Sequence, residues 1–396
     1  MRNNIYALRA GLLGCGLALA LAGDAQAGKF TVLHSFVGGS SDGASPLGGL
    51  APAGNGGFYI ATDGGGSSNR GTLTLLRKDG TTQVLHAFTG GTDGQNADGT
   101  PLVWPSDDRN VYGTTQFGGA SGCGTFYKYI PGSDTYQQIY APECAPEGAF
   151  PFAGLVWDRA KDVLMGTGYN GGSNDDGTLF AFDTVGNFGT ECPNSFSGSN
   201  GSHPYAGMSF AYGNGYTVTT SGGQSSLGTI LEFPYGNESC IVTVLHAFAG
   251  GAGDGAIPYG RLLYNKHMLY GTTSKGGAPG LGVVFKINLD GSNFAVLHTF
   301  QGINQNSDGS FPHAGLTLNK ADGMLYGTTI NGGNGSDLGT VFKIDPETGV
   351  ETVVHAFSGS DGAHPYGDLY INKGNIYGTT AAGGASNLGV VFRLKT

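Results

Sequence analysis

Short apolar segments separated by glycine-rich polar stretches recur in a fixed order along the chain. Residues 270–273 read Tyr-Gly-Thr-Thr, residues 282–286 read Gly-Val-Val-Phe-Lys, and residues 296–300 read Val-Leu-His-Thr-Phe. The same order returns within residues 326–357, and a Pro-x-x-Gly-Leu segment such as 151–155 precedes each set. Apolar runs of this length bounded by glycine are typical of β-strands. Four short strands per repeat predict the blade of a β-propeller.

The number of repeats follows from positions that recur once in every copy. One position is separated by between 52 and 57 residues from copy to copy, and another is a glycine that opens the third strand. The first comprises His34, His86, Tyr140, Asn194, His246, His298 and His355. The second comprises Gly71, Gly124, Gly177, Gly228, Gly282, Gly339 and Gly389. The sequence therefore predicts an all-β, seven-bladed propeller with four strands per blade, as a single domain over residues 28–396 without helices.

The repeat region does not begin and end at the boundary of a repeat. The region begins with a fourth-strand segment at 30–36 and ends with a third-strand segment at 389–394. We expect the N-terminal strand to complete the last blade, which would close the ring and leave no free sheet edge.

The first 27 residues have the features of a secretory signal peptide. Arg2 and Arg9 precede an apolar segment at 11–22, and Ala25-Gln26-Ala27 resembles a cleavage site. The alternative is a short membrane anchor, but the apolar segment is too short to span a bilayer. We expect cleavage before Gly28, a secreted or periplasmic protein, and no membrane span in the mature chain.

Composition narrows the classes of partner. The chain has a formal net charge of −10, which becomes −11 without residues 1–27, and only 12% of its residues are charged. Nucleic-acid binding needs clustered Lys and Arg, so we expect no nucleic-acid partner. The 75 glycines would suit a disordered chain, but 22 Phe and 19 Tyr can form a core. We expect a monomer that binds an unknown protein or glycan.

The repeats resemble the GloVer tandem repeat family of bacterial exported proteins. Tyr326-Gly327-Thr328-Thr329, the segment 339–343 and His355-Ala356-Phe357 carry the resemblance, which extends over residues 29–396. It implies an exported, propeller-like protein and no established activity. A quinone cofactor is not supported, because the tryptophan of quinoprotein-type repeats is missing, and we expect no cofactor.

Five repeats carry a histidine in the fourth strand: His34, His86, His246, His298 and His355. Equivalent residues of different blades lie far apart, whereas zinc needs three or four ligands around one point. We therefore expect no metal, and a structural role in which each imidazole bonds a hydroxyl or backbone group of its own blade.

A polar residue followed by glycine precedes the first strand of every repeat: Asp42, Asp93, Glu147, Asn200, Asp254, Asp308 and Asp361. One interpretation is a repeated Asx turn. The other is a ring of carboxylates around one mouth of the channel, which would attract cations or basic ligands. Both interpretations can hold together.

The third and fourth repeats depart most from the pattern. Tyr140 and Asn194 replace the histidine, and polar loop residues there include Tyr169 and His203. A Tyr, His and carboxylate set could perform acid–base chemistry on a glycan, while drift in a redundant scaffold is the plainer explanation. We expect a binding or interaction scaffold. The alternatives are an enzyme acting on polysaccharide, either hydrolase or lyase, and a structural cell-surface component.

Four cysteines follow the predicted signal peptide. Cys123 lies just before a third strand and Cys144 just after the fourth strand of the same repeat, so antiparallel pairing brings them to one face. Cys192 and Cys240 remain, and their pairing is expected by elimination.

Overall fold

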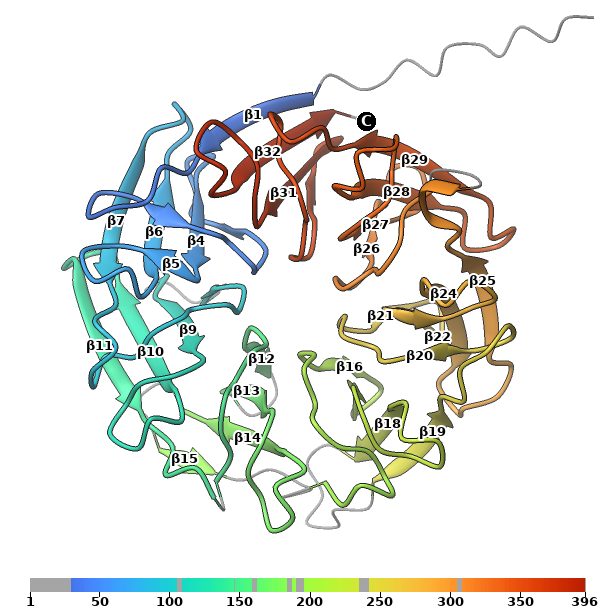
Figure 1. Cartoon of the computed structure of the whole chain (residues 1–396). Helices are drawn as coiled ribbons and strands as arrows, with labels where there is room; N and C mark the ends of the chain where they lie inside the picture. Colours follow the sequence, from blue (N-terminus) through green and yellow to red (C-terminus); the bar gives the residue numbers. More distant parts are fainter. Residues whose placement is uncertain are drawn as a thin grey trace, which may run out of the picture.

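The computed structural model describes residues 30–104, 109–145, 147–158, 162–183, 187–189, 196–234, 242–304 and 308–395. Seven four-stranded antiparallel sheets surround a central channel, as Figure 1 shows. The predicted seven-bladed propeller is confirmed.

The four strands of each blade follow one another from the channel outward. Blades 1 to 4 contain β3 (Ala51–Pro52), β4 (Phe58–Thr62), β6 (Thr72–Leu76) and β7 (Thr82–Ala87); β8 (Leu102–Val103), β9 (Val111–Thr115), β10 (Thr125–Ile130) and β11 (Thr135–Tyr140); β12 (Val156–Asp158), β13 (Val163–Gly168), β14 (Thr178–Phe182) and β15 (Phe188–Gly189); and β16 (Ser209–Ala211), β17 (Asn214–Thr219), β18 (Thr229–Pro234) and β19 (Thr243–Ala247).

Blades 5 to 7 contain β21 (Leu263–Asn265), β22 (Met268–Thr273), β24 (Val283–Asn288) and β25 (Ala295–Thr299); β26 (Thr317–Leu318), β27 (Leu325–Thr329), β28 (Thr340–Ile344) and β29 (Glu351–Ala356); and β30 (Tyr370–Asn372), β31 (Asn375–Thr380), β32 (Val390–Lys395) and β1 (Phe30–Ser35).

The two ends of the repeat region meet in blade 7. β1 pairs antiparallel with β32, with Phe30 opposite Leu394 and Ser35 opposite Val390. The predicted closure is therefore confirmed, and β1 is the outer strand of the last blade (Figure 1).

The innermost strands are shorter than the sequence predicted. The Pro-x-x-Gly-Leu segment at 151–155 lies ahead of β12, which begins only at Val156. In this segment the backbones of neighbouring blades approach closely. A Cβ on Gly367 would lie 2.5 Å from the backbone of Gly48. The segment therefore packs against the next blade instead of extending the sheet of its own blade.

The loops before the first strand and after the second strand lie on one face and are joined there. β2 (Gly43–Ala44) pairs with β5 (Gly64–Gly65), and β20 (Gly255–Ala256) pairs with β23 (Lys275–Gly276). Single β-bridges make the same connection in the other blades. One turn of 3₁₀ helix, η1 (Gly302–Asn304), interrupts a loop of this kind, although the sequence predicted no helix.

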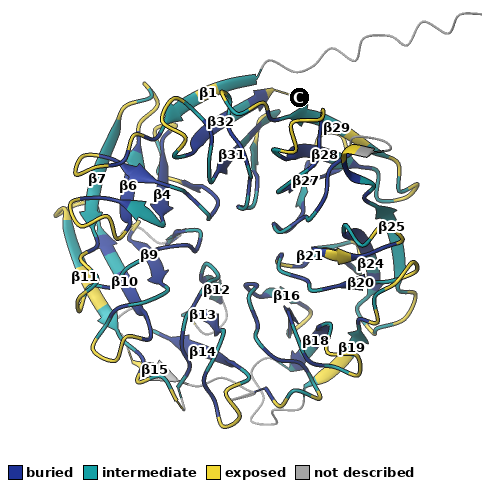
Figure 2. Cartoon of the chain, in the orientation of Figure 1, coloured by how far each residue is buried: buried dark blue, intermediate teal, exposed yellow. Residues whose placement is uncertain are grey.

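The hydrophobic core lies between blades. Phe285 of β24 is fully buried in one cluster with Val218 of β17 and Ile230 of β18, which belong to the preceding blade. Figure 2 shows the second and third strands of the blades mainly buried and the outermost strands partly exposed. Stacking of blades face to face explains why apolar residues occur on both faces of each strand.

The glycine that opens each third strand has a steric role. Gly339 has φ +96°, and a Cβ there would lie 2.3 Å from the carbonyl oxygen of Thr329. The same conflict recurs at the equivalent glycines, so only glycine fits this position.

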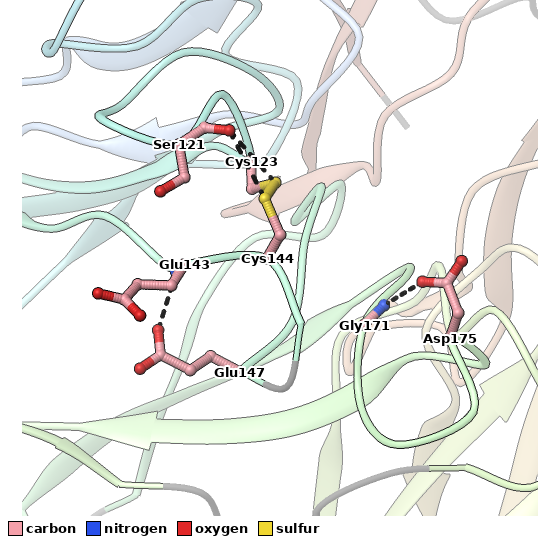
Figure 3. Close-up of a disulfide and its surroundings, with 7 residues drawn as sticks. All are labelled: Ser121, Cys123, Glu143, Cys144, Glu147, Gly171 and Asp175. Carbon is pink, nitrogen blue, oxygen red and sulfur yellow. Dashed lines mark hydrogen bonds between the residues drawn. A yellow bond between two sulfur atoms is a disulfide. The ribbon is translucent and has the colours of Figure 1, made fainter.

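The predicted bridge between Cys123 and Cys144 is confirmed, with the two Cα atoms 5.4 Å apart (Figure 3). It joins the start of the third strand of blade 2 to the loop after β11. Cys192 and Cys240 lie outside the described residues, as do residues 1–27, and their predicted roles remain predictions.

Candidate functional site: the central channel

The channel is lined by one residue from each blade, four positions before the first residue of the innermost strand. Two residues later comes a further lining position that is usually glycine. We call the first set the channel ring: Leu47, Asp98, Phe152, Tyr205, Tyr259, His313 and Tyr366.

A left-handed residue two positions earlier orients every member of the channel ring. These seven non-glycine residues have φ between +51° and +57°: Ser45, Asn96, Phe150, His203, Ile257, Phe311 and His364. The conformation is rare for a β-branched residue such as Ile257. Its amide donates to the carbonyl of Leu227 in the preceding blade, and its carbonyl accepts from the amide of Ser274. Hydrogen bonds to two blades thus hold the turn.

The ring side chains touch one another inside the channel. Phe152 stacks on Tyr205 with ring centroids 4.7 Å apart, and Tyr259 stacks on His313 at 4.3 Å. Tyr205 also meets His313 edge to face at 5.1 Å, although two blade steps separate them. Tyr366 meets the His313 ring edge to face, with the ring centroids 5.1 Å apart. The aromatic side chains therefore narrow the channel at this level.

Asp98 is the acidic member of the channel ring. Its side chain is almost fully buried, and its Oδ1 atom has no hydrogen-bond partner among the described residues. Burial, together with the adjacent Asp63, raises the pKa of Asp98 well above its usual range. The Asp63 carboxyl group lies beside that of Asp98, and the Asn96 amide donates to Asp63 at 2.7 Å. These surroundings favour the protonated form of Asp98.

Burial also favours the uncharged forms of the other titratable members of the ring. Burial lowers the pKa of His313 to about 4. Burial raises the pKa of Tyr205, Tyr259 and Tyr366. The imidazole of His313 is only partly covered, but the surface it exposes faces the narrow channel and not bulk water. The ring thus offers phenol hydroxyl groups, a neutral imidazole and a carboxyl group whose protonated form is favoured.

Charged side chains line the channel at the position two residues after the channel ring. At this position four blades have glycine, whereas the other three blades have Thr100, Arg261 and Asp368. Asp368 accepts the backbone N–H of Gly315 at 2.7 Å, and Thr100 accepts that of Gly49 at 2.7 Å. The cavity bounded by all these residues has a volume of about 290 Å³. A mostly aromatic lining with a few polar groups is characteristic of small-molecule sites.

The predicted carboxylates lie elsewhere, at the outer side of each blade. None of them lines the channel cavity. Each caps a backbone N–H of its own turn, as Asp42 does for Val37 at 3.0 Å and Glu147 for Glu143 at 2.9 Å (Figure 3). The remaining caps of this kind are Asp93, Asn200, Asp254, Asp308 and Asp361. This geometry is that of a turn cap, one of the two interpretations of the sequence.

The same carboxylates bind the recurring histidines. The Nε2 atoms of His34, His298 and His355 each lie 2.9 Å from a carboxylate oxygen, and His86 and His246 make equivalent pairs. The partner expected from the sequence was a hydroxyl or a backbone group. Tyr140 donates to Glu147 in the same way, whereas Asn194 lies outside the described residues. The recurring histidine and the recurring carboxylate, which are two separate positions in the sequence pattern, therefore form one interaction.

Tyr169 and His203 lie beside the channel ring. Their rings are 4.8 Å apart, and Tyr169 also packs edge to face on Phe152 at 5.2 Å. These two predicted residues are thus brought together, behind the aromatic members of the ring. The channel ring itself was not predicted from the sequence. Its signal is the residue that follows the recurring proline, or Ala97 in its place in the second repeat. This residue is aromatic in five of seven repeats, counting His313.

Comparison with known proteins identifies the repeat and the fold. The family model described as the Gloeobacter/Verrucomicrobia repeat matches residues 16–231 and 211–396. No curated protein matches the sequence. Among the described residues, no helix has the length and apolar character needed to cross a membrane.

Two of the similar solved structures show the range of proteins that share this fold. A puromycin-hydrolyzing peptidase of Mycobacterium tuberculosis has a TM-score of 0.57 and 13% identity, covering 90% of this chain and 54% of the peptidase. An oligogalacturonate lyase in complex with manganese has a TM-score of 0.55 and 11% identity, covering 93% of this chain and 97% of the lyase. The chain spans about half the length of the peptidase. Identities this low establish the fold alone.

Proposed function

The chain belongs to the Gloeobacter/Verrucomicrobia repeat family, and we propose that it is a binding protein whose central channel holds one end of a glycan, about one or two sugar units deep. The observation that carries this proposal is the Oδ1 atom of Asp98, which is buried in the channel wall and lacks a partner among the described residues. Buried polar atoms are nearly always hydrogen-bonded, so a ligand hydroxyl is the natural partner.

The character of the lining supports a neutral, hydroxyl-rich ligand. Tyr259 and Tyr366 offer uncharged phenol groups, and Asp98 offers a carboxyl group whose pKa is raised by burial. Aromatic faces pack against the apolar face of a sugar ring while polar edges bind its hydroxyls. The volume of about 290 Å³ lies at the lower end of the range for small-molecule sites, roughly 300–1,000 Å³, which suits a short ligand.

Glycan hydrolysis, the alternative raised by the sequence, receives less support from the channel. The carboxyl groups of Asp63 and Asp98 lie next to each other. The two carboxyl groups of glycosidases instead stand about 5 Å or more apart, on either side of the bond that breaks. Adjacent carboxyl groups of this kind suit a binding site better than a glycosidase site.

We further propose that the protein works outside the cytoplasm after cleavage before Gly28. The disulfide between Cys123 and Cys144 supports this location, because disulfides persist mainly in oxidising compartments.

A glycan array followed by calorimetric titration of the best ligand tests the proposed function. We expect Asp98→Ala and Tyr259→Ala each to weaken binding at least about tenfold, because each removes about 1.5 kcal/mol or more of buried contact. Asp98→Asn keeps the shape of the side chain and checks that any loss is not caused by misfolding.

Tyr212→Ala is the matched control, because Tyr212 is an exposed tyrosine outside the channel lining. It should bind the glycan like the wild type. Binding that is equal in the channel variants and the wild type, or the lack of any glycan ligand, would contradict the proposal.

A further inference from the structure

Three metal-ligating side chains gather between blades 5 and 6, away from the channel. They are His298 on β25, Asp308 in the loop that follows, and Glu351 on β29. One ligand atom from each, the imidazole nitrogen and one oxygen of each carboxylate, lies within 4.8 Å of the others. His298 and Asp308 form the recurring pair, whereas Glu351 comes from a different position of the next repeat.

The equivalent position in other blades shows what Glu351 replaces. This position lies four residues before the recurring histidine, and its side chain covers the histidine of the preceding blade. Phe30 stacks on His355 at 3.9 Å, Tyr136 on His86 at 3.6 Å, and Phe294 on His246 at 3.8 Å. Blade 6 places a carboxylate where these blades have an aromatic ring.

That carboxylate is poorly satisfied by the protein. The Oε1 atom of Glu351 is buried and has no hydrogen-bond partner among the described residues. Asp308 is almost fully buried, and its Oδ1 accepts the backbone N–H groups of Gln301 and Gly302. Its Oδ2 lies 2.9 Å from His298 Nε2. Two carboxylates and one imidazole therefore meet where the protein supplies few donors for Glu351.

We propose that His298, Asp308 and Glu351 bind a divalent transition-metal ion such as Zn²⁺ at the junction of blades 5 and 6. A neutral imidazole and two carboxylates carry two negative charges, which one divalent ion balances. Zinc accepts this mixture of nitrogen and oxygen ligands, at about 2.0–2.2 Å. The ion would replace the proton shared by His298 and Asp308 and would draw in Glu351 by rotation of its long side chain.

The expectation of no metal rested on the distance between equivalent histidines. That argument does not apply to this cluster, because the ligands come from three different positions of two adjacent repeats. Burial and Asp308 raise the pKa of Glu351 to about 8.

Binding of Zn²⁺ to the purified, chelator-treated protein without a histidine tag tests the proposal. We expect calorimetry to give one Zn²⁺ per chain and the Tm to rise by several degrees when Zn²⁺ is about 100-fold above its Kd. Glu351→Gln preserves the shape of the side chain and should weaken Zn²⁺ binding at least about tenfold. Glu351→Phe, which copies the residue of blade 5, should do the same.

Asp361→Asn is the matched control. Asp361 pairs with His355 at 2.9 Å as Asp308 does with His298, but Phe30 covers that histidine in place of a carboxylate. This variant should bind Zn²⁺ like the wild type. The proposal is overturned if the wild type binds no Zn²⁺ or if both Glu351 variants bind it as tightly as the wild type.

Discussion

The surroundings of single side chains in the channel ring favour their uncharged forms. Burial lowers the pKa of His313 and raises that of Asp98, where the neighbouring Asp63 adds to the effect. Neither change can be inferred from residue type, because both depend on enclosure by several blades. The channel ring consequently differs from a charged mouth, which was one expectation from the sequence.

His313 should make the stability of the folded protein depend on pH. Its pKa is about 4 in the folded protein, compared with about 6.5 in an unfolded chain. The unfolded state therefore binds a proton first as the pH falls from about 6.5 to 4, and the free energy of unfolding decreases by at most about 1.4 kcal/mol per pH unit. His313→Tyr, which copies Tyr259 and Tyr366, should remove this contribution.

Urea unfolding of both proteins at pH 7.5, 5.5 and 4.5 measures the effect. The difference in unfolding free energy between variant and wild type should shift in favour of the variant as the pH falls. A difference that stays constant with pH would show that His313 titrates normally in the fold.

At the scale of strands, buried threonines connect the second and third strands of a blade. Thr329 at the end of β27 lies 2.8 Å from the hydroxyl of Thr340 on β28 and donates to the carbonyl of Asn331. The pairs Thr62–Thr72, Thr115–Thr125 and Thr219–Thr229 repeat this contact. The Tyr-Gly-Thr-Thr motif is thus explained by a buried hydrogen bond as well as by strand propensity.

Thr329→Val should destabilise the protein by about 1–3 kcal/mol, because it leaves buried polar groups without partners. Thr340→Val should cost less, since blade 5 already combines Thr273 with Val283 at these two positions. Chemical unfolding of both variants measures the difference. Equal losses, or no loss for Thr329→Val, would mean that the hydroxyl contributes little.

The fourth strands show a feature that the sequence pattern hides. In six of the described blades the register shifts just before the histidine position, as between Val32 and His34 in β1 or between Leu73 and Thr74 opposite β7. A β-bulge of this kind redirects the next side chain. The histidine can therefore reach the carboxylate of the following turn, a partner that strand alternation alone would not predict.

For the whole molecule, ring closure depends on the strand at the start of the described chain. β1 supplies the outer strand of blade 7, and Phe30 also stacks on Phe392 and His355. Its removal would expose both the edge of β32 and the aromatic side chains beneath it. The N-terminal strand therefore joins the two ends of the repeat array.

Deletion of residues 28–37 should lower the Tm substantially or cause aggregation, because an unpaired edge strand and apolar surface become exposed. A thermal melt with light scattering compares the deletion with the intact chain. Replacement of Phe30 by Ala is the milder control and should lower the Tm less. An unchanged melting curve for the deletion would contradict the role assigned to β1.

The sequence by itself determined the repeat, the number of blades, the closure through β1 and the Cys123–Cys144 bridge. The repeat, the number of blades and the bridge follow from spacing along the chain, because each of the first six blades is built from residues that are near in sequence and pair locally. The closure follows from the order of the strands at the two ends, since the repeat region starts with a fourth strand and ends with a third strand. Only the tertiary structure decided where Asp98, His313 and Glu351 lie relative to other blades. Their chemistry depends on contacts between repeats, which involve inward turns, bulges and close backbone approach that periodicity does not encode.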